Sequence, residues 1–308
     1  MPLVGTKCCQ GGERLFSYCL DECRGERCLH PLHILKYMAR NEALREGIEY
    51  SATSILGCAR RQVLQKRVDF YEDPDANVAR FVGDAVHEMS HALLLGEPGY
   101  VGETRIWATV GLRAGRDFEA VPGEAPRGRD FRLSGKADQR WFESRVVDLK
   151  TTGKIPNAPR VDHVAQINIY AWMMRYGEDE FGRPLNLNID RGSVVYVSGN
   201  QKREVVYNVP IWDEDRQLAF IKDRLEAHVY TAETGEYPPV LTPQIVHHRD
   251  GSATVTRDWH CDWCPVRTDC DALATAERGV SPDHIDYWEQ GPGVFARPVG
   301  EPTFEEGF

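Results

Sequence analysis

The sequence predicts an α/β fold in which helices flank a central mixed β-sheet. Three observations predict it. Hydrophobic residues make up 42% of the 308 residues, which is enough to build a substantial core. The apolar spacing is helical up to Leu95 and changes to the alternation of strands from Val101. Segments of the two kinds then follow in the order helix, helix, three strands, helix, two strands, helix.

The N-terminal part of the chain is expected to be helical. A Cys-rich head, residues 1–48, ends in a predicted helix from His33 to Arg45. The run Ser51-Ala52-Thr53-Ser54 offers hydroxyl N-caps for the next helix. That helix is expected to pass through Cys58 and to end near Val68.

A longer helix is predicted from about Ala76 to Leu95. Asp73-Pro74-Asp75 is typical of a helix start, and Gly96 and Pro98 mark its end. Apolar residues recur along it at helical spacing: Val78, Phe81, Val82, Val86, Met89 and Leu93.

Strands are predicted in the middle of the chain. Val101 to Leu112 alternates between apolar and polar residues, and residues 113–130, rich in Gly, Pro and charge, are expected to form a long loop. Arg132 to Phe142 and Arg145 to Thr151 are predicted to be two strands joined by a tight turn.

The rest of the chain alternates between the two kinds of element. In order, we expect a helix at 161–176, a hairpin of strands 192–198 and 204–209 around Gly199-Asn200, a helix at 212–234, a Pro-rich turn at 235–243 and a Cys-rich segment at 259–275. The chain is thus predicted to have a head at 1–48, a main domain at 49–275 and a loose, acidic, Gly- and Pro-rich tail at 276–308.

Composition excludes two classes of protein. No apolar run approaches the roughly 20 residues of a membrane helix, and Met1 to Lys7 lacks the apolar stretch of a secretion signal. A cytoplasmic protein with no membrane partner is expected. A net charge of -10 argues against a wholly basic surface, although a groove needs only local positive charge. The cluster Arg60, Arg61, Lys66 and Arg67 is either a solvated helix face or a nucleic-acid contact.

The nine cysteines are clustered. Five lie in the first 28 residues, Cys58 stands alone, and Cys261, Cys264 and Cys270 lie near the other end. An odd number of cysteines without an export signal argues against a disulfide framework, and clustered intracellular cysteines indicate metal.

Two carboxylates on neighbouring predicted strands are expected to meet. Asp138 and Asp148 lie ten residues apart across a tight turn, and Lys150 projects from the same strand face as Asp148. Carboxylate oxygens suit a hard cation such as Mg²⁺, and the Leu149 carbonyl is a candidate third oxygen ligand. Lys150 is then placed to orient the attacking water or lower its pKa.

Three side chains from the predicted helices complete the candidate site. His87 adds a nitrogen ligand, which suits Mn²⁺ somewhat better than Mg²⁺. Gln166 and Tyr170 lie four residues apart, on one helical face, where they are expected to hold the lysine, the water or a DNA phosphate or base.

Four short motifs carry these residues. In chain order they are Gly83-Asp84-Ala85-Val86-His87, Gly135-Lys136-Ala137-Asp138, Asp148-Leu149-Lys150 and Gln166-Ile167-Asn168-Ile169-Tyr170. Over roughly residues 50–275, this order of G-x-x-x-H, G-x-x-D, D-x-K and Q-x-x-x-Y resembles the RecB-like branch of the PD-(D/E)XK nucleases. The resemblance implies a restriction-endonuclease-like core and hydrolysis of DNA phosphodiester bonds, exonucleolytic on single-stranded or frayed ends.

The cysteines extend the resemblance. One upstream cysteine, Cys58, followed after the core by Cys261, Cys264 and Cys270, resembles the iron–sulfur nucleases, namely AddB-type domains and CRISPR-associated RecB-like exonucleases. This similarity implies a 4Fe–4S cluster that staples the C-terminal segment to the core. Four thiolates around structural zinc are the alternative.

The similarity also implies DNA ends as substrate, in a bacterial or phage-infected cell. Proteins of recombination, DNA repair, replication or CRISPR adaptation, of cellular or bacteriophage origin, are the expected partners.

Two rival functions remain. His87-Glu88-Met89-Ser90-His91 is a literal H-E-x-x-H, which predicts a zinc metalloprotease. That interpretation leaves Asp138, Asp148 and Lys150 without a role. A DNA-binding module without catalysis is the second rival, and the intact acidic residues argue against it.

The head holds a separate candidate zinc site. Its ligands would be Cys8 or Cys9 with Cys19, Cys23 and Cys28, and His30 or His33 is an alternative ligand. Free cysteines are equally compatible with the C-x3-C-x4-C spacing.

Overall fold

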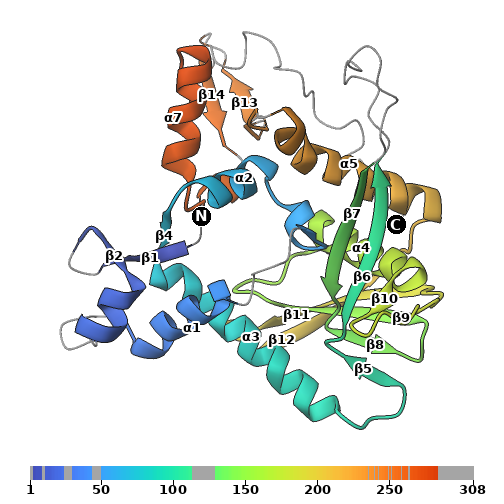
Figure 1. Cartoon of the computed structure of the whole chain (residues 1–308). Coiled ribbons are helices and arrows are strands. Elements are labelled where there is room, and N and C mark those ends of the chain that lie inside the picture. The colour runs from blue at the N-terminus through green and yellow to red at the C-terminus, as the bar shows by residue number, and fades with distance from the viewer. Residues whose placement is uncertain are drawn as a thin grey trace, which may run out of the picture. The chain divides into compact units, whose positions relative to one another are not determined.

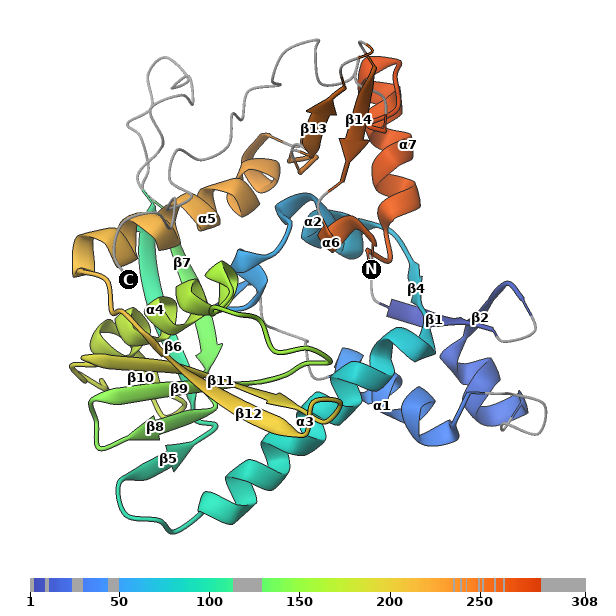
Figure 2. The same cartoon turned by 180° about the vertical axis from the view of Figure 1, so that it is seen from behind.

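The structure of the protein is a computed structural model, seen from two sides in Figures 1 and 2. It describes residues 3–8, 11–23, 30–43, 50–112, 129–234 and 236–283, the last range without 239, 242, 249, 251, 258 and 263. Most of the predicted loop 113–130 and the predicted tail beyond 283 therefore lie outside the described residues. Among the described residues, none of the helices combines the length and the hydrophobicity of a membrane span.

The chain divides into two compact units that interleave in sequence. Unit 1 comprises residues 1–5, 58–72 and 227–308, and unit 2 comprises 6–57 and 73–226. The predicted division at residues 48 and 275 stays a prediction.

Unit 2 contains two mixed sheets. The four-stranded sheet has the order β10 (Glu178–Asp179), β6 (Arg105–Leu112), β7 (Arg129–Lys136), β3 (Tyr50–Ser51). The five-stranded sheet has the order β12 (Arg203–Val209), β11 (Arg191–Ser198), β9 (Arg145–Thr151), β8 (Gln139–Trp141), β5 (Tyr100–Gly102). The pairs β3–β7 and β9–β11 are parallel and the others antiparallel, so the predicted mixed α/β fold is confirmed.

Two predicted strands are broken where the two sheets separate. Val101 to Leu112 was expected to be continuous, but Glu103 has a left-handed φ of 48° and divides β5 from β6. Arg132 to Phe142 is likewise divided, because Ala137 and Asp138 lie between β7 and β8. The Glu103 N–H donates to the Asp138 carbonyl at 3.2 Å and holds the two breaks together. Asp138 therefore lies beside a strand end, not within the predicted strand.

Helix α4 (Val161–Tyr176) has the predicted bounds and forms the centre of unit 2. It packs against β6, β7, β9 and β11, and residues 164–174 are all buried. A helix buried on all sides must satisfy its polar side chains internally. Asn168 does so, because its amide donates to the carbonyls of Val164 and Pro210 and its oxygen accepts from the Trp212 N–H.

Helix α3 (Pro74–Leu94) begins as predicted but buries a different face than its pattern suggests. Asp73 is the N-cap and accepts from the Asp75 N–H. The helix packs against α1 (Leu32–Ala43) and β9. Four apolar side chains of the predicted stripe are exposed instead of buried: Val78, Val82, Met89 and Leu93. The remaining elements of unit 2 are β2 (Glu13–Leu15), the π-helix η1 (Tyr18–Cys23) and the 3₁₀ turn η2 (Ser54–Leu56).

Unit 1 is smaller and is assembled from distant stretches. Its elements are β4 (Phe70–Glu72), α2 (Ala59–Arg67), β13 (Gln244–His247), β14 (Ala253–Thr256), α6 (Trp259–Asp262) and α7 (Arg267–Arg278). Strand β1 (Leu3–Lys7) and helix α5 (Glu214–Thr234) cross the division between the units. Helix α2 packs against α7, and Val240 and Ala274 form a small core that Cys270 contacts.

The predicted helix from Ser51 to Val68 is wrong in its start. Residues 54–56 form a separate 3₁₀ turn, and α2 begins at Ala59 with Cys58 as its N-cap. The Cys58 sulfur accepts from the Arg61 N–H at 3.4 Å, so a thiol takes the place expected of a hydroxyl. The hairpin of β13 and β14 was not predicted, and helix α5 begins at Glu214 rather than at Trp212.

Candidate active site

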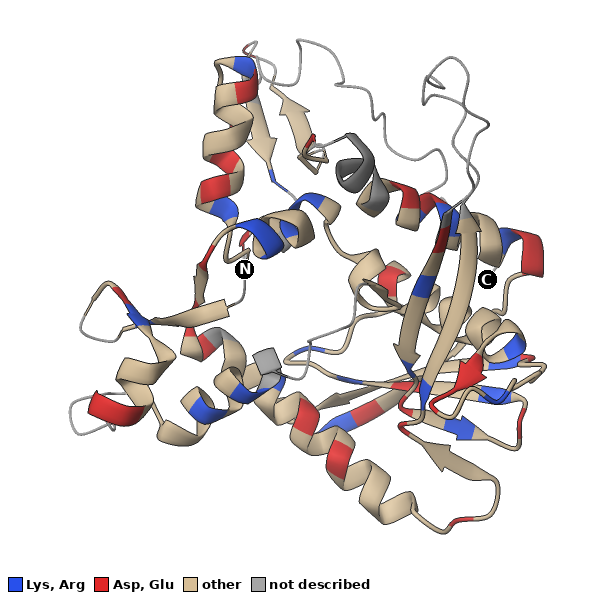
Figure 3. Cartoon of the chain, viewed as in Figure 1, with Lys and Arg blue, Asp and Glu red and all other residues tan. Residues whose placement is uncertain are grey.

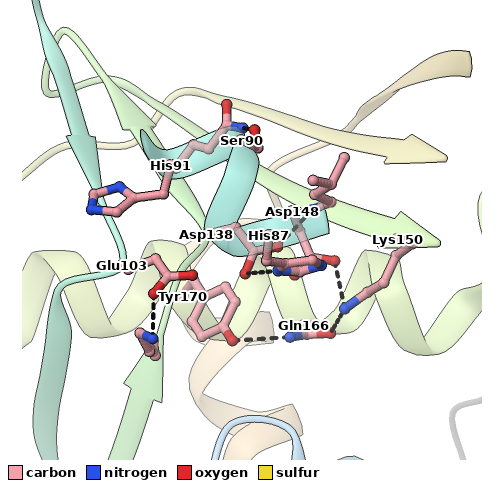
Figure 4. A network of polar contacts seen from close by, with 12 residues as sticks. His87, Ser90, His91, Glu103, Asp138, Asp148, Lys150, Gln166 and Tyr170 are labelled. Carbon is pink, nitrogen blue, oxygen red and sulfur yellow. Dashed lines mark hydrogen bonds and ion pairs between the residues drawn. The ribbon is translucent and has the colours of Figure 1, made fainter. Parts of the chain in front are cut away.

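Six predicted site residues come together in unit 2 (Figure 4). They are His87 on α3, Asp138 at the break before β8, Asp148 and Lys150 on β9, and Gln166 and Tyr170 on α4. Four separate stretches of sequence therefore contribute to one polar cluster.

Strand pairing brings the two carboxylates together. In the antiparallel pair of β8 and β9, Gln139 lies opposite Val147, so the next residues outward are Asp138 and Asp148. One oxygen of Asp138 accepts from the Leu149 N–H at 2.7 Å. The other lies 3.2 Å from His87 Nδ1. Asp138 is thus fixed between a strand and helix α3.

A chain of polar contacts runs from β9 to α4. Lys150 Nζ lies 2.8 Å from Asp148 Oδ2 and donates to Gln166 Oε1 at 3.0 Å. The Gln166 amide then donates to the Tyr170 hydroxyl at 2.9 Å. The spacing of two residues on the strand and four on the helix produces these contacts, as the sequence predicts.

Two motif glycines allow the surrounding elements to approach one another. A Cβ at Gly83 of α3 would lie 3.1 Å from Thr151 Oγ1, at the end of β9. A Cβ at Gly135 of β7 would lie 3.0 Å from Tyr170 Cε1 and from the Met173 sulfur on α4. Both distances are tighter than ordinary contact, so these glycines permit the close packing that brings His87 and Tyr170 into the site.

The site is buried enough to perturb its ionisable groups. Burial raises the pKa of Asp148 to about 6, against the opposing effect of the Lys150 charge. Burial also raises the pKa of Tyr170 to about 12. For Lys150, burial acts to lower the pKa, but the charges of Asp148 and Asp138 outweigh it and the pKa is raised. The pKa of His87 is raised because Asp138 and Asp148 outweigh the effect of burial.

The donor set fits a divalent cation. Both carboxylate oxygens of Asp148 are buried without a hydrogen-bond donor, although Lys150 lies beside one of them as an ion pair. A buried carboxylate short of donors is typical of a metal ligand. Within the described ranges, no three His, Cys, Asp or Glu side chains are gathered closely enough to hold a metal as they stand. The carboxylates are instead held by Lys150, His87 and the Leu149 N–H.

A small pocket beside the cluster contains residues that the motif reasoning left out. His91, Tyr100 and Glu103 line it together with His87 and Asp138. His91 Nδ1 lies 2.9 Å from the Tyr100 hydroxyl, and Glu103 forms an ion pair with Lys136. The motif reasoning gave His91 no role in a nuclease site, although its position one helical turn after His87 was an available signal. The two histidines of H-E-x-x-H thus bond to different partners, His87 to Asp138 and His91 to Tyr100.

The four cysteines that were predicted to bind a metal centre come together in unit 1. Cys58, Cys261, Cys264 and Cys270 line one cavity of about 380 Å³ of empty space, which includes open solvent. None of the four forms a disulfide bond. Burial raises the pKa of Cys58 to about 12 and also raises those of Cys264 and Cys270. Four thiols around one cavity fit an iron–sulfur cluster or a zinc ion by their chemistry, although they are not gathered as closely as a bound metal requires.

The predicted head site is described in part. Cys19 is buried on η1, and Cys8 and Cys23 are free thiols, whereas Cys9 and Cys28 lie outside the described residues. His30 Nδ1 lies 3.9 Å from Asp75 Oδ1, and the His33 ring packs against Phe81. Zinc binding by the head stays a prediction.

Comparison with known proteins identifies the family to which the chain belongs. The model of the PD-(D/E)XK nuclease superfamily matches residues 34–271, which is more than half of the chain. No curated protein matches the chain. Among solved structures, the chain is similar to one titled "Crystal structure of SSO0001", with 17% identity, a TM-score of 0.48, and coverage of 78% of this chain and 95% of that one. It is also similar to an alkaline exonuclease from Laribacter hongkongensis, with 13% identity, a TM-score of 0.33, and coverage of 63% and 91%.

Proposed function

This chain belongs to the PD-(D/E)XK nuclease superfamily, and from that premise we propose that it hydrolyses phosphodiester bonds of DNA with Mg²⁺ or Mn²⁺. The observation that carries the proposal is that Asp138, at the break before β8, lies beside Asp148 and Lys150 on β9. Two carboxylates beside an ammonium group suit a hard cation and a phosphate better than they suit a peptide substrate.

We assign the side chains as follows. Asp138, Asp148, the Leu149 carbonyl and His87 would hold the cation, which when bound activates water and shields the charge that develops on phosphate. Lys150 already pairs with Asp148 and donates to Gln166, so its ammonium group is placed to orient the attacking water and stabilise the transition state. Gln166 fixes the lysine, and Tyr170 fixes Gln166.

The choice of substrate is a further part of the proposal. We propose exonucleolytic cleavage of single-stranded or frayed DNA ends, in the cytoplasm of a bacterial or phage-infected cell. Proteins of recombination, replication or CRISPR adaptation are the proposed partners. These assignments rest on the motif resemblance described in the sequence analysis.

We also propose that Cys58, Cys261, Cys264 and Cys270 hold a 4Fe–4S cluster. The support is their convergence on one cavity from the start of α2 and from the segment that includes α6 and α7. Because those stretches lie about two hundred residues apart, a bound cluster would close a long loop and so stabilise unit 1. Iron, sulfide and zinc analysis of the purified protein distinguishes the cluster from the zinc alternative.

A direct assay tests the proposed reaction. The purified protein is incubated with end-labelled single- and double-stranded DNA and Mn²⁺ or Mg²⁺, with casein as a parallel substrate. We expect nucleotides or short fragments from DNA and no cleavage of casein. The variants Asp148→Asn and Lys150→Met should abolish DNA cleavage, and Mn²⁺-dependent activity in either variant would refute the assignment.

One substitution separates the nuclease from the metalloprotease. Glu88 is the general base that H-E-x-x-H chemistry requires, but it is exposed on α3. We expect Glu88→Gln to leave DNA cleavage within about twofold of wild type, as surface changes usually have small effects. Casein cleavage that disappears in Glu88→Gln would establish the rival function. Tight DNA binding without cleavage under all metal conditions would establish the non-catalytic alternative.

A further inference from the structure

Two buried arginines lie beside the four-cysteine cavity of unit 1. The side chains of Arg60 on α2 and Arg257 after β14 are 1% and 5% exposed. Removing a guanidinium group from water is costly unless opposite charge and hydrogen-bond acceptors surround it. Figure 3 shows basic residues along much of α2, where Lys66 and Arg67 are exposed as a solvated helix face would be. Arg60 departs from that pattern, because it points into the unit.

The protein partners of these arginines leave several donors unused. Arg60 donates to the Pro238 carbonyl at 2.9 Å and to Glu277 at 3.1 Å. Arg257 donates to Asp271 at 2.6 Å. Among the described residues, Nε of both arginines and Nη1 of Arg257 are buried without a hydrogen-bond acceptor, although Nη1 lies 3.8 Å from the Asp283 carboxylate as an ion pair. Each arginine carries five N–H donors, so donors remain after it has bonded to its carboxylate partner.

Both guanidinium groups lie next to the cysteines. Arg257 lines the cavity together with the four cysteines. Burial raises the pKa of the Cys270 thiol, and the nearby charge of Arg60 opposes that rise. Arg61 and Arg267 line the same cavity. Asp271 pairs with Arg257 and lies close to Arg267, and Asp283 lies 3.8 Å from Arg257 Nη1 and 3.7 Å from Arg267 Nη2. None of these carboxylates lines the cavity itself, so the described charged side chains that line it with the thiols are positive.

The charge of a metal-bound site explains this arrangement. Four thiolates around either a 4Fe–4S core or zinc keep a net negative charge, which buried arginines offset and hydrogen-bond. Neutral thiols would be weak acceptors for guanidinium donors. We propose that Arg60 and Arg257 are the counter-ions of the four-cysteine site, which hold its metal centre as an anion. This inference rests on the proposed metal site but does not depend on which metal occupies it.

The proposal has a consequence for an iron–sulfur cluster. One-electron reduction adds negative charge, and a neighbouring positive charge stabilises the reduced form. Removing either arginine should therefore lower the midpoint potential. A tenfold shift in the reduction equilibrium corresponds to about 59 mV for one electron.

The test compares variants of the full-length protein as purified. Arg60→Met and Arg257→Met remove the charge and all donors, and Arg257→Lys keeps the charge. We measure iron, sulfide and zinc per chain, the rate of metal release to a chelator, and the midpoint potential where iron is present. We expect each methionine variant to release metal at least about tenfold faster than wild type, as expected for the loss of a charged hydrogen bond. The lysine variant should fall between methionine and wild type.

Two controls separate a counter-ion from a merely structural arginine. Glu277→Gln removes the carboxylate partner of Arg60 but leaves its guanidinium beside Cys270, so metal release should stay at the wild-type rate. Lys66→Gln removes an exposed positive charge from the same helix and should also have no effect. If a methionine variant fails to fold, Arg257→Lys and Glu277→Gln still decide the question.

The outcomes discriminate between the two proposals. Zinc without iron in the wild type overturns the cluster, and the arginine proposal is then judged by zinc release. Unchanged release and potential in both methionine variants would overturn the counter-ion role. So would equal acceleration by Glu277→Gln, because that result shows that anchoring rather than charge matters.

Discussion

The carboxylate site of unit 2 and the four-cysteine cavity of unit 1 bury polar groups in different ways. In the first, each carboxylate lies beside a basic group of the same unit, Asp138 beside His87 and Asp148 beside Lys150. In the second, four thiols face arginines whose donors are partly unused. The first site can therefore stay assembled without a cation, whereas we propose that the second is completed only by a metal centre.

The proposed cation of unit 2 and the proposed metal centre of unit 1 should therefore affect different properties of the protein. Removing the cation from unit 2 should affect the reaction and leave the fold, because Lys150 already balances the charge of Asp148. Removing the metal centre from unit 1 should affect the fold first.

The largest effect is expected at the Asp148–Lys150 pair. Asp148→Asn or Lys150→Met should lower DNA cleavage by about 10³-fold or more, because each removes a group that stabilises developing charge. The melting temperature should change by only a few degrees. In Lys150→Met the remaining Asp148 can become neutral by taking up a proton, because burial raises its pKa to about 6. In Asp148→Asn the remaining Lys150 can reach solvent, because its side chain is 23% exposed.

The control for that experiment is Lys154→Met, which removes an exposed lysine shortly after β9. It should retain wild-type cleavage and stability. Unfolding of the Asp148 and Lys150 variants at room temperature would break the comparison, since the carboxylate site would then be as essential to the fold as the cysteines.

The second prediction concerns the cysteines. Cys264→Ser should abolish iron binding and absorbance near roughly 400 nm, and should lower the melting temperature by about 10 °C or more. Cleavage measured well below the melting temperature should fall far less than in Lys150→Met. Cys23→Ser is the matched control and should keep the iron, and a loss of zinc in that variant would locate zinc in the head.

A third prediction uses a titratable residue near the carboxylate site. Burial lowers the pKa of His163 on α4 from its ordinary 6.5 to about 4, and the charges of Lys150 and Arg160 act in the same direction against Asp162. Its Nδ1 lies 2.7 Å from the Tyr196 hydroxyl. Because the unfolded chain binds the proton more readily, the stability contributed here is present above pH 6.5 and is lost as the pH falls toward 4.

The expected loss is roughly 3 kcal/mol over that range. Chemical denaturation of wild type and His163→Gln at pH 7, 5.5 and 4.5 measures it, with glutamine as a neutral acceptor for the Tyr196 hydroxyl. The difference between the two proteins should shrink as the pH is lowered. Parallel curves for the two proteins would show that His163 titrates normally.

The smallest effect is expected at Tyr170. Tyr170→Phe removes the hydroxyl that accepts from Gln166 but leaves Lys150 and both carboxylates in place. Cleavage should fall by about 3- to 10-fold, in keeping with one lost neutral hydrogen bond. Tyr176→Phe, on the exposed end of the same helix, should have no effect. A loss at Tyr170 as large as at Lys150 would place the phenol in direct contact with the substrate.

Much of the site was predictable because its spacing rules are local. Two residues along a strand place Lys150 beside Asp148, and four along a helix place Tyr170 beside Gln166. The bounds of α4 and the start of α3 followed from apolar spacing and capping in the same way. Those relations hold wherever the element packs.

The predictions were wrong or incomplete where contacts between distant parts of the chain determine the structure. Apolar spacing predicted that α3 is a helix but did not show that Val82, Met89 and Leu93 are exposed. Alternation also gave no sign of the breaks at Glu103 and Asp138, because a strand pattern continues through them. The place of His91, on α3 beside the carboxylates, was missed because it depends on a contact with Tyr100 of strand β5.

The amino-acid sequence alone established the order of the motifs, the types of element that carry them and the chemistry of the two donor sets. The folded structure was needed to show that the strands break at Asp138, that the motif glycines permit close packing around His87 and Tyr170, and that Arg60 is buried near Cys270 from the other end of the chain. The physical reason is that backbone periodicity is set by neighbouring residues. Burial and charge pairing depend on segments that meet only after folding.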